Sequence, residues 1–308
     1  EMHDRSRFKV FLYGFSPRGS DAVRDRMIGA VDIYDDVLAM PDRDVALLAR
    51  QDKIDIAIDL NGYTENSRSD IFSYRAAPIQ ISYLGYPGTM GADFIDYIVA
   101  DKHLIPVDYQ RYYSEKPIYL PHQYQSQDNS LPISEKVPTR AELGLPETAF
   151  VFCALSNSYK ITPEEFDIWM RLLIKVKGSI LWLRRSNEQS NKNIMTAAQK
   201  RNIDSSRLVF ADKLPMDEHL SRHKLADLFI DTFAFNAHTT TTEALWAGLP
   251  VVTKQGQGFA TRVAGSLLNS IGLSELITSS ESEYESLILE LAMNPNKLRK
   301  VKEKLNKN

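Results

Sequence analysis

The sequence contains a single cysteine, Cys153, among 308 residues. One thiol cannot close an internal disulfide, so the chain is not a disulfide-stabilised extracellular scaffold. The apolar run AFVFCAL around it favours a small buried side chain over a nucleophile. The chain also has no apolar run long enough to span a membrane and no leader of the charged-then-apolar kind. These absences predict a cytoplasmic protein with no membrane partner.

Several motifs of enzyme chemistry are absent as well. The six histidines lack the paired spacing of metal ligands. Neither the phosphate loop of kinases nor the GxGxxG fingerprint of dehydrogenases is found. If the protein binds a diphosphate, helix N-termini and cationic side chains must neutralise it, without a metal or a cofactor.

The overall composition is typical of a globular protein. Hydrophobic residues make up 43% of the chain and charged residues 25%, and 308 residues suffice for two domains. The formal net charge of −3 argues against nucleic acid as the main partner. The basic last dozen residues, KLRKVKEKLNKN, alternate with Leu and Val as on a solvated helix face, and we interpret them as surface.

Short β-rich runs alternate with helical patterns, which predicts an α/β fold of mostly parallel sheets. The topology rules place functional loops at the carboxyl ends of such strands. The expected strands are KVFLYGF, VDIYDDVL, KIDIAIDL, PIQISYL and FIDYIVA in the first half, and FVFCAL, SILWLRR, RLVFAD, DLFIDTF and LPVVTK in the second. The expected helices cover residues 20–29, 42–51, 164–176, 191–201, 216–223, 240–248 and 259–271.

A stretch rich in Ser, Gln and Asp separates the two series of elements. Four prolines fall between Pro121 and Pro146. This composition predicts a linker over residues 126–147, between a first Rossmann-like domain, 1–125, and a second, 148–308. We therefore expect two doubly wound domains that face a cleft.

The stretch FAFNAHTTTTEALWAGLPVV, residues 233–252, indicates a hydroxyl-rich turn, a helix and a buried strand. Four threonines, Thr239 to Thr242, lie where the helix should begin. A helix start exposes unpaired N–H groups and the positive end of the dipole, which favour an anion. The alternative is helix capping, because Thr240 and Glu243 have the spacing of a capping box.

Two loops in the first half follow expected strands, DLNGY at residues 59–63 and LGYPGT at residues 84–89. Pro87 and Gly88 have the residue types of a type II turn, in which the glycine supplies a positive φ. From spacing alone, turn chemistry is the favoured explanation of both loops.

Lys160 lies in SNSYKITPEEF, just after the first strand of the second half. Thr162 is placed to cap a helix that begins at Pro163, with Glu165 completing a capping box. A lysine at this position could hold its ammonium beside a phosphate bound at the helix start. The competing interpretation is an exposed, solvated lysine.

His219 and Arg222 are three residues apart in MDEHLSRHKLADLF and so share one face of a short helix. An imidazole can stack on a base and a guanidinium can bond its edge or the phosphates, whereas the alternative is an ordinary surface face. His238 could donate to a phosphate or serve as a polar residue at a helix start. Glu243 could accept from both ribose hydroxyls, which is the rival to its capping role.

Longer segments carry a resemblance to a known family. They are DLNGYTENSRSDIFSYRAAPIQISYLGYPGTMGADFIDYIVAD, YSEKPIYLPH, SYKITPEEFDIWMRLL, ILWL, EHLSRHKLADLFIDT, HTTTTEALWAGLPVVT and RVAGSLLNSIGLSELI. With them the chain resembles the catalytic region of protein O-GlcNAc transferases and the related SPINDLY-type protein O-fucosyltransferases. The resemblance implies a two-domain GT-B glycosyltransferase, inverting and metal-independent. Such an enzyme transfers a sugar from a nucleotide diphosphate to Ser or Thr hydroxyls of proteins.

The resemblance also implies roles for matching residues. Lys160 would neutralise the leaving diphosphate and is the residue expected to be essential. His219 would stack on the base with Arg222 near it, and Glu243 stands where the animal enzyme has an Asp on the ribose. The diphosphate would be bound by His238, Thr239 and Thr240, and the sugar side of the cleft would be lined by Leu84, Gly85 and Tyr86.

Several positions depart from the animal enzyme and bear on the donor. Asn157 takes the place of a nucleotide-contacting glutamine and shortens it, Phe235 replaces a smaller cysteine near the sugar, and Met216 replaces a lysine beside the nucleotide. The histidine of HTTTTEALW matches the GlcNAc enzymes, whereas its unbroken threonine run looks like the fucosyl branch. UDP-GlcNAc is the expected donor and GDP-fucose the alternative.

The resemblance further implies segments that this chain lacks. A first strand, whose loop carries an aspartate and a His-Pro pair near the acceptor hydroxyl, should precede KVFLYGF, and a tetratricopeptide arm usually recruits protein substrates. The fold is therefore expected to be truncated at both ends, and the general base cannot be named. Two other functions stay open, a nucleotide-sugar 2-epimerase on the same fold and a non-catalytic nucleotide-binding module.

Overall fold

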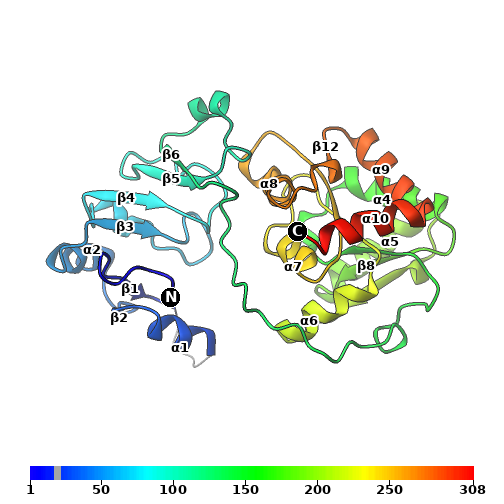
Figure 1. Ribbon diagram of the computed structural model, residues 1–308, viewed down its shortest axis with the longest axis horizontal. Coiled ribbons are helices and arrows are strands. Elements are labelled where there is room, and N and C mark those ends of the chain that lie inside the picture. Colours follow the sequence, from blue (N-terminus) through cyan, green and yellow to red (C-terminus); the bar gives the residue numbers. More distant parts are fainter. Residues whose placement is uncertain (17–21) are drawn as a thin grey trace. The chain divides into compact units, whose positions relative to one another are not determined.

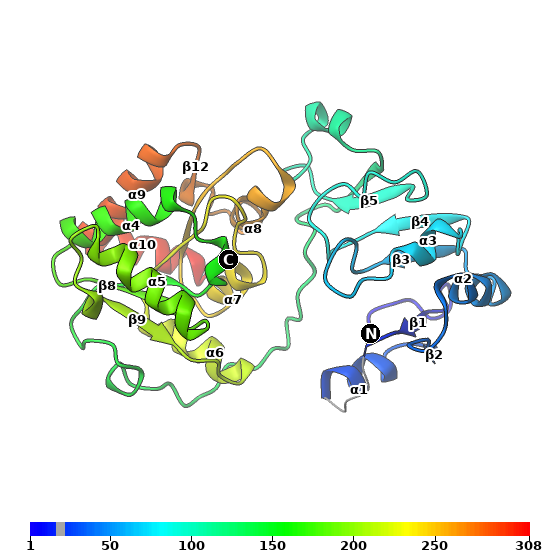
Figure 2. The ribbon, with the colours of Figure 1, turned by 180° about the vertical axis from the view of Figure 1, so that it is seen from behind.

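The computed structural model describes residues 1–16 and 22–308. Internal contacts divide these residues into two compact units, Glu1–Val99 with Tyr112–Pro117 and Ala100–Arg111 with Ile118–Asn308. Figure 1 draws the first unit largely in blue and cyan and the second in green to red, and Figure 2 shows both from behind. The segment predicted as a linker, 126–147, counts with the second unit in this division, and its role as a linker stays a prediction.

Two sheets form most of the first unit. β1 (Phe11–Gly14) pairs with β2 (Ile33–Asp36), and a second sheet has the order β3-β4-β5-β6. The pairs β1 with β2, β3 with β4 and β4 with β5 are parallel, as the alternating pattern predicts. The strands of the second sheet are β3 (Ile56–Asp59), β4 (Ile79–Ser82), β5 (Tyr97–Ala100) and β6 (Lys116–Tyr119), of which β6 was not predicted.

The helices of the first unit follow their apolar spacing. α2 (Asp42–Gln51) has the predicted bounds, and its buried residues Val45, Ala46 and Ala49 join the core of this unit. α1 (Ala22–Gly29) matches the later part of the helix predicted over 20–29, whose first two residues lie outside the described residues. A single turn, α3 (Asp70–Ser73), packs against α2.

One face of β3 carries exposed apolar side chains. Ile56 and Ile58 are 48% and 50% exposed, whereas Ala57 between them packs against the core. Within residues 1–16 and 22–308, β3 pairs with β4 alone and β1 pairs with β2 alone. Each of these two strands therefore has an edge that no described strand covers.

The second unit is built on one six-stranded parallel sheet in the order β12-β11-β10-β7-β8-β9. In chain order the sheet grows from β7 through β8 and β9, then restarts on the other side of β7 with β10, which is a doubly wound arrangement. All five expected strands are present, and β12 is an addition. They are β7 (Val151–Ala154), β8 (Ile180–Arg184), β9 (Leu208–Ala211), β10 (Leu228–Ile230), β11 (Val251–Lys254) and β12 (Ile277–Thr278).

Both faces of this sheet are buried because its strands are apolar at consecutive positions. In β7, Phe152 and Ala154 join one core cluster, while Val151 and Cys153 join the other. Cys153 is fully buried, and burial raises its pKa to about 12, so the expectation of a buried structural thiol is confirmed. The first cluster includes residues of α4 (Pro163–Lys175), α5 (Glu188–Gln199), α9 (Glu281–Met293) and α10 (Pro295–Leu305), and the second includes Ala244 of α7 (Thr239–Trp246).

The last helix corrects one expectation from the sequence. Its charged residues alternate with Leu298, Val301 and Leu305, which are buried in the first core cluster, so the interpretation of this segment as surface is wrong for its apolar stripe. The other predicted helices are present as α6 (Met216–Arg222) and α8 (Val263–Ser270). No helix in residues 1–16 and 22–308 combines the length and the apolar character needed to cross a membrane.

Tyr284 of α9 makes hydrogen bonds that connect this helix to the end of β10 and to α4, and its substitution measures what they contribute to stability. Its buried hydroxyl donates to the Asp231 carbonyl over 2.8 Å and accepts from the Trp169 indole over 3.2 Å. Tyr284→Phe leaves both partners unpaired, so we expect the free energy of unfolding in urea to fall by about 1–3 kcal/mol. The control Tyr159→Phe alters a residue that is 79% exposed and should change it by less than about 0.5 kcal/mol. Equal losses in the two variants would contradict this account of the network.

Candidate functional site

The second unit places its polar loops where the order of strands reverses. β7 and β10 are neighbours in the sheet, but the chain leaves β7 towards β8 and leaves β10 towards β11 on the opposite side. Loops that follow two such strands diverge, and doubly wound folds usually bind ligands at this point. The segments concerned are residues 156–160 after β7 and 231–238 after β10.

Lys160 ends a short 3₁₀ turn, Ser158–Lys160, between β7 and α4. The start of α4 has the predicted capping box. The Thr162 N–H donates to Glu165 Oε1 over 2.7 Å, and the Thr162 hydroxyl donates to Oε2 of the same carboxylate. This confirmed cap fixes the backbone just after Lys160 and so limits where its side chain can reach.

The Lys160 ammonium faces the loop after β10. Its Nζ donates to the Asn236 carbonyl over 3.1 Å and lies 4.0 Å from the centre of the Phe235 ring. Burial lowers the pKa of Lys160 to about 8, and the Asp231 carboxylate opposes that fall. The interpretation of Lys160 as an exposed, solvated lysine is therefore wrong.

Asp231 organises the same loop and was not predicted from the sequence. Its Oδ1 accepts from the N–H groups of Thr232 (2.8 Å) and Ala237 (2.7 Å), and its Oδ2 accepts from the Thr253 hydroxyl over 2.7 Å. Its side chain is buried, and burial raises its pKa to about 7. The available signal was an acidic residue at the end of the apolar run DLFIDTF.

His238 directly precedes α7 and stacks on Phe235, with ring centroids 4.5 Å apart. Its Nε2 lies 3.0 Å from the Ala260 carbonyl, which can only accept, so Nε2 carries the proton. Burial lowers the pKa of His238 to about 4, so the ring is neutral near pH 7. In this arrangement the imidazole donates to a phosphate only after it gains a second proton or gives up Ala260.

α7 begins at Thr239, one residue earlier than predicted, and the side chain of its N-cap residue, His238, makes no capping hydrogen bond. The hydroxyls of Thr241 and Thr242 donate to the carbonyls four residues before them, over 2.5 Å and 3.4 Å. The capping box predicted for Thr240 and Glu243 is wrong, because the Glu243 carboxylate contacts another helix. His238 thus leaves the N–H groups of the first turn of α7 uncapped.

The Glu243 carboxylate contacts α6 through His219, whose Nε2 lies 3.2 Å from Glu243 Oε2. The Arg222 guanidinium donates to His219 Nδ1 and, over 2.5 Å, to the Asp212 carbonyl. Because a guanidinium can only donate, Nδ1 is the acceptor, and Nε2 carries the hydrogen and donates it in the bond to Glu243 Oε2. Arg222 is 3% exposed, so the alternative of an ordinary surface face is wrong.

Asn157 lies beside the end of the neighbouring strand β8. Its Oδ1 accepts from the Arg184 guanidinium over 2.6 Å, and its Nδ2 donates to the Tyr159 hydroxyl over 3.2 Å. These side-chain bonds join Asn157 to none of the other predicted site residues, whereas the contacts gather the rest of those in the second unit into two groups. One group holds Lys160, Phe235 and His238 with the start of α7, and the other holds His219, Arg222 and Glu243. α7 belongs to both groups.

Leu84, Gly85 and Tyr86 follow β4 in the first unit. The Gly85 N–H donates to the carbonyl two residues earlier over 3.1 Å, which makes a γ-turn centred on Leu84. The positive φ of this loop falls on Leu84, at 77°, and not on Gly88, so the predicted type II turn is wrong. A non-glycine residue in this conformation is strained and must be held by its surroundings.

The loop after β3 supplies part of that hold. Asp59 Oδ1 accepts from the N–H groups of Asn61 and Gly62 over 2.9 Å each. A Cβ added to Gly85 would lie 2.2 Å from the Leu60 carbonyl oxygen, so only glycine fits against this loop. The two loops singled out in the sequence therefore support each other within the first unit.

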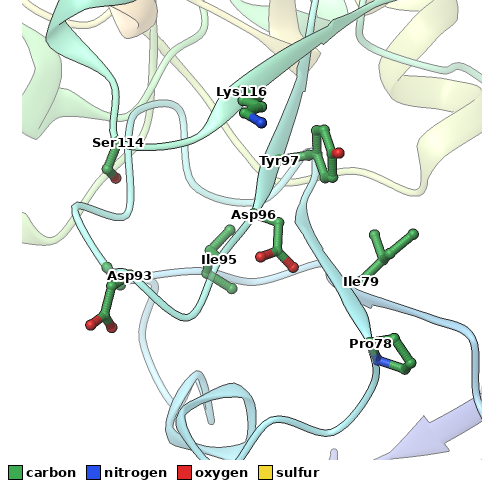
Figure 3. A pocket seen from close by; sticks show the side chains of 9 residues that line it. Pro78, Ile79, Asp93, Ile95, Asp96, Tyr97, Ser114 and Lys116 are labelled. Atoms are coloured by element: carbon green, nitrogen blue, oxygen red, sulfur yellow. The ribbon is translucent and has the colours of Figure 1, made fainter.

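A pocket of about 350 Å³ lies at the amino ends of β4, β5 and β6 in the first unit, whereas the loop of Leu84 follows the carboxyl end of β4 (Figure 3). Its walls come from the segments before β4 and β5 and from the start of β6. The Asp96 carboxylate in this pocket accepts from the Arg75 guanidinium and the Gln80 N–H, over 2.8 Å each. None of the predicted site residues lines it. Within the described ranges, no three His, Cys, Asp or Glu side chains are grouped to hold a metal ion.

Comparisons with known proteins agree on one family. The model of glycosyl transferase family 41 matches residues 1–131 and 125–308. A probable UDP-N-acetylglucosamine–peptide N-acetylglucosaminyltransferase of Arabidopsis thaliana, SEC, is 39% identical over 99% of this chain and 32% of its own length. A UDP-N-acetylglucosamine–peptide N-acetylglucosaminyltransferase of Caenorhabditis elegans is 28% identical over 99% of this chain and 36% of its own.

A solved structure of a mutant O-GlcNAc transferase from Thermobaculum terrenum superposes with a TM-score of 0.91 at 31% identity. The match covers 99% of this chain and 58% of that chain. It confirms the predicted α/β fold of the GT-B class. The chain spans about a third of the length of the curated relatives it matches.

The bonds around His219 predict a fixed tautomer. NMR of the imidazole nitrogens should find the proton on Nε2. Arg222→Lys should weaken this preference, because an ammonium lacks the planar fork that reaches both His219 and the Asp212 carbonyl. Arg184→Lys, at the arginine that contacts Asn157, is the matched control and should leave the His219 signals unchanged. A proton on Nδ1 in the parent protein would contradict the arrangement.

Proposed function

The chain belongs to glycosyl transferase family 41, and from this premise we propose that it takes part in transferring a sugar from a nucleotide-diphosphate donor to Ser or Thr hydroxyls of proteins. The proposed donor is UDP-GlcNAc, the sugar nucleotide in the names of its relatives. The proposed transfer is inverting and metal-independent, as the resemblance of the sequence implies.

The activity is proposed for the whole protein, since relatives are about three times as long as this chain. Protein acceptors and a tetratricopeptide arm that recruits them belong to the same proposal. The domain boundaries, the absent first strand and the cytoplasmic location stay predictions.

The observation that most supports the proposal is the meeting of Lys160 with the segment that opens α7. The lysine follows β7, the segment follows β10, and the Lys160 Nζ donates to the Asn236 carbonyl just ahead of the helix. The ammonium and the uncapped N–H groups of α7 both favour negative charge. When the bond to the sugar breaks, negative charge develops on the leaving diphosphate, and preorganised positive groups stabilise it. Lys160 is the proposed catalytic residue, and His238, Thr239 and Thr240 form the proposed diphosphate site.

The nucleotide is proposed to lie further along α7, at the group formed by His219, Arg222 and Glu243. An imidazole held from both ring nitrogens offers a fixed flat surface on which a base can stack. The Glu243 carboxylate takes one bond from His219 and has further acceptor capacity for ribose hydroxyls. Because the capping role of Glu243 is excluded, the ribose role is the one that we propose. Asn157 is proposed as a further nucleotide contact.

The sugar side is proposed to involve Phe235, whose ring contacts both the Lys160 ammonium and the His238 ring. Leu84, Gly85 and Tyr86 of the first unit are proposed to line the sugar site as well. The strained φ of Leu84 and the close approach of Gly85 to the Leu60 carbonyl support a functional loop, because strain of this kind is retained where geometry matters.

Lys160→Ala is expected to lower the rate of transfer to a peptide acceptor by about 10²–10³-fold in the full-length protein, because one preorganised charge is lost at the leaving group. Lys254→Ala is the matched control. Lys254 is the last residue of β11, and its Nζ also lies 4.0 Å from a phenylalanine ring, that of Phe233. Its loss should leave the rate unchanged. An undiminished rate in Lys160→Ala would show the proposed mechanism to be wrong.

The same assay separates the other functions left open. Conversion of the donor without an acceptor peptide would favour the 2-epimerase. Tight binding of UDP without any transfer by the longest native chain would favour a non-catalytic module.

The donor is tested by thermal unfolding with UDP-GlcNAc or GDP-fucose. A ligand that binds the native state at about a hundred times its Kd stabilises the protein by about 2.7 kcal/mol, so the true donor should raise the melting temperature. We expect UDP-GlcNAc to do so and GDP-fucose not. The opposite result would assign the chain to the fucosyl branch.

A further inference from the structure

A single peptide group joins Lys160 to Asp231. Its carbonyl, from Asn236, accepts from Lys160 Nζ over 3.1 Å, and its N–H, from Ala237, donates to Asp231 Oδ1 over 2.7 Å. Because both bonds use one planar amide, their directions are fixed relative to each other. The oxygen of the amide meets the cation and its hydrogen meets the anion, so each bond polarises the group in the sense that strengthens the other.

The loop holds this peptide group from several directions. The Asn236 N–H donates to the Ala260 carbonyl over 3.0 Å, and Asn236 Nδ2 donates to the Thr232 carbonyl over 2.9 Å. The Thr232 hydroxyl in turn donates to the Phe235 carbonyl over 2.7 Å. Asn236 is completely buried. The flexible lysine side chain must therefore adapt to the loop, and the loop is set by Asp231.

We propose that Asp231 is a positioning residue for Lys160. By fixing the Asn236–Ala237 peptide it directs the ammonium, and by its own negative charge it keeps that ammonium protonated until a diphosphate binds. Asp231 is 1% exposed, so in this proposal it acts through Lys160 and not by contact with the donor. The inference rests on the proposed function, in which Lys160 meets the diphosphate.

Several ionisable groups lie near Lys160 and Asp231, and we take Asp231 to be the charged partner of Lys160. His238 also faces Lys160 but is neutral near pH 7, because burial lowers its pKa to about 4. Tyr284 faces Asp231 and is neutral too, since burial raises its pKa well above the usual value. Glu165 on α4 is near Tyr284, and burial raises its pKa. Burial lowers the pKa of Lys160 to about 8 and raises that of Asp231 to about 7, so neither group keeps its charge easily without the other.

Asp231→Asn removes the negative charge of residue 231 but can keep its hydrogen bonds to the loop. The amide oxygen of Asn can accept the bonds from Thr232 and Ala237, and its NH₂ can donate to the Thr253 hydroxyl, so the loop should keep its shape. We expect the pKa of Lys160, followed by NMR of reductively methylated lysines, to fall. The affinity for UDP, measured by calorimetry, should fall about fivefold at pH 8 and recover near pH 6.5, where Lys160 is protonated in both proteins.

Two controls accompany this variant. Glu165→Gln removes another buried carboxylate of the same unit, one that makes no bond to the Asn236–Ala237 peptide. Because Gln can also complete the capping box with Thr162, this variant should leave the Lys160 pKa unchanged. Uridine lacks the diphosphate and should bind the parent and Asp231→Asn equally.

Stability provides a further check on folding. Burial raises the folded-state pKa of Asp231 from 3.8 to about 7, so its ionisation costs stability as the pH rises through that range. Above pH 7 the folded protein pays this cost in full, and a neutral Asn avoids it. The melting temperature of Asp231→Asn at pH 8 should therefore be no lower than that of the parent.

The outcomes distinguish the inference from the proposed function. An unchanged Lys160 pKa in Asp231→Asn, or a loss of UDP affinity that is equal at both pH values, would overturn the inference and leave Asp231 a structural residue. The proposed function fails separately, if Lys160→Ala binds UDP as tightly as the parent.

A second variant keeps the inference testable if Asp231→Asn does not fold. Thr253→Val removes one donor to the Asp231 carboxylate, which raises the pKa of Asp231. With less negative charge near pH 8, the pKa of Lys160 should again fall, by less than in Asp231→Asn. An unchanged value in this variant would overturn the inference too.

Discussion

A parallel sheet that is buried on both faces can carry polar chemistry only at the ends of its strands, and the second unit depends on this constraint. Phe152 and Val151, adjacent in β7, point into different core clusters and leave no face of the strand for polar groups. Lys160 follows β7, and Asp231 directly follows β10. These two strands are neighbours in the sheet. The reversal of strand order between them brings the two charged residues to the same place.

The features that the sequence predicted well are local ones. Each expected strand of the second unit is present because a run of apolar residues bounded by polar ones admits few alternatives. The capping box of Thr162 and Glu165 was predictable because its partners are three residues apart. The shared face of His219 and Arg222 follows from helical spacing in the same way. The placement of Lys160 beside the start of α4 needed no knowledge of the sheet.

The features that the sequence did not predict depend on which distant segments meet. The bond from Lys160 to the Asn236 carbonyl joins residues 76 positions apart and exists because β7 and β10 are adjacent. Glu243 has the spacing of a cap, but His219 from another helix takes its carboxylate. The turn assigned to Gly88 failed for a similar reason, since the positive φ falls on Leu84, where the chain packs against the loop after β3.

The indirect link between Lys160 and Asp231 lets the lysine keep its positive charge and still offer N–H donors to a diphosphate. A fully solvated lysine keeps its proton, but water screens its field; a buried lysine acts through a lower dielectric but tends to lose its proton. A direct ion pair with a carboxylate would preserve the charge, yet it would occupy the donors that a diphosphate needs and would make the ligand compete with a resident anion. With a peptide group between them, Asp231 supports the charge of Lys160, and among residues 1–16 and 22–308 the ammonium donates one hydrogen bond, to the Asn236 carbonyl. The remaining donors can then turn to a diphosphate without breaking the link to Asp231.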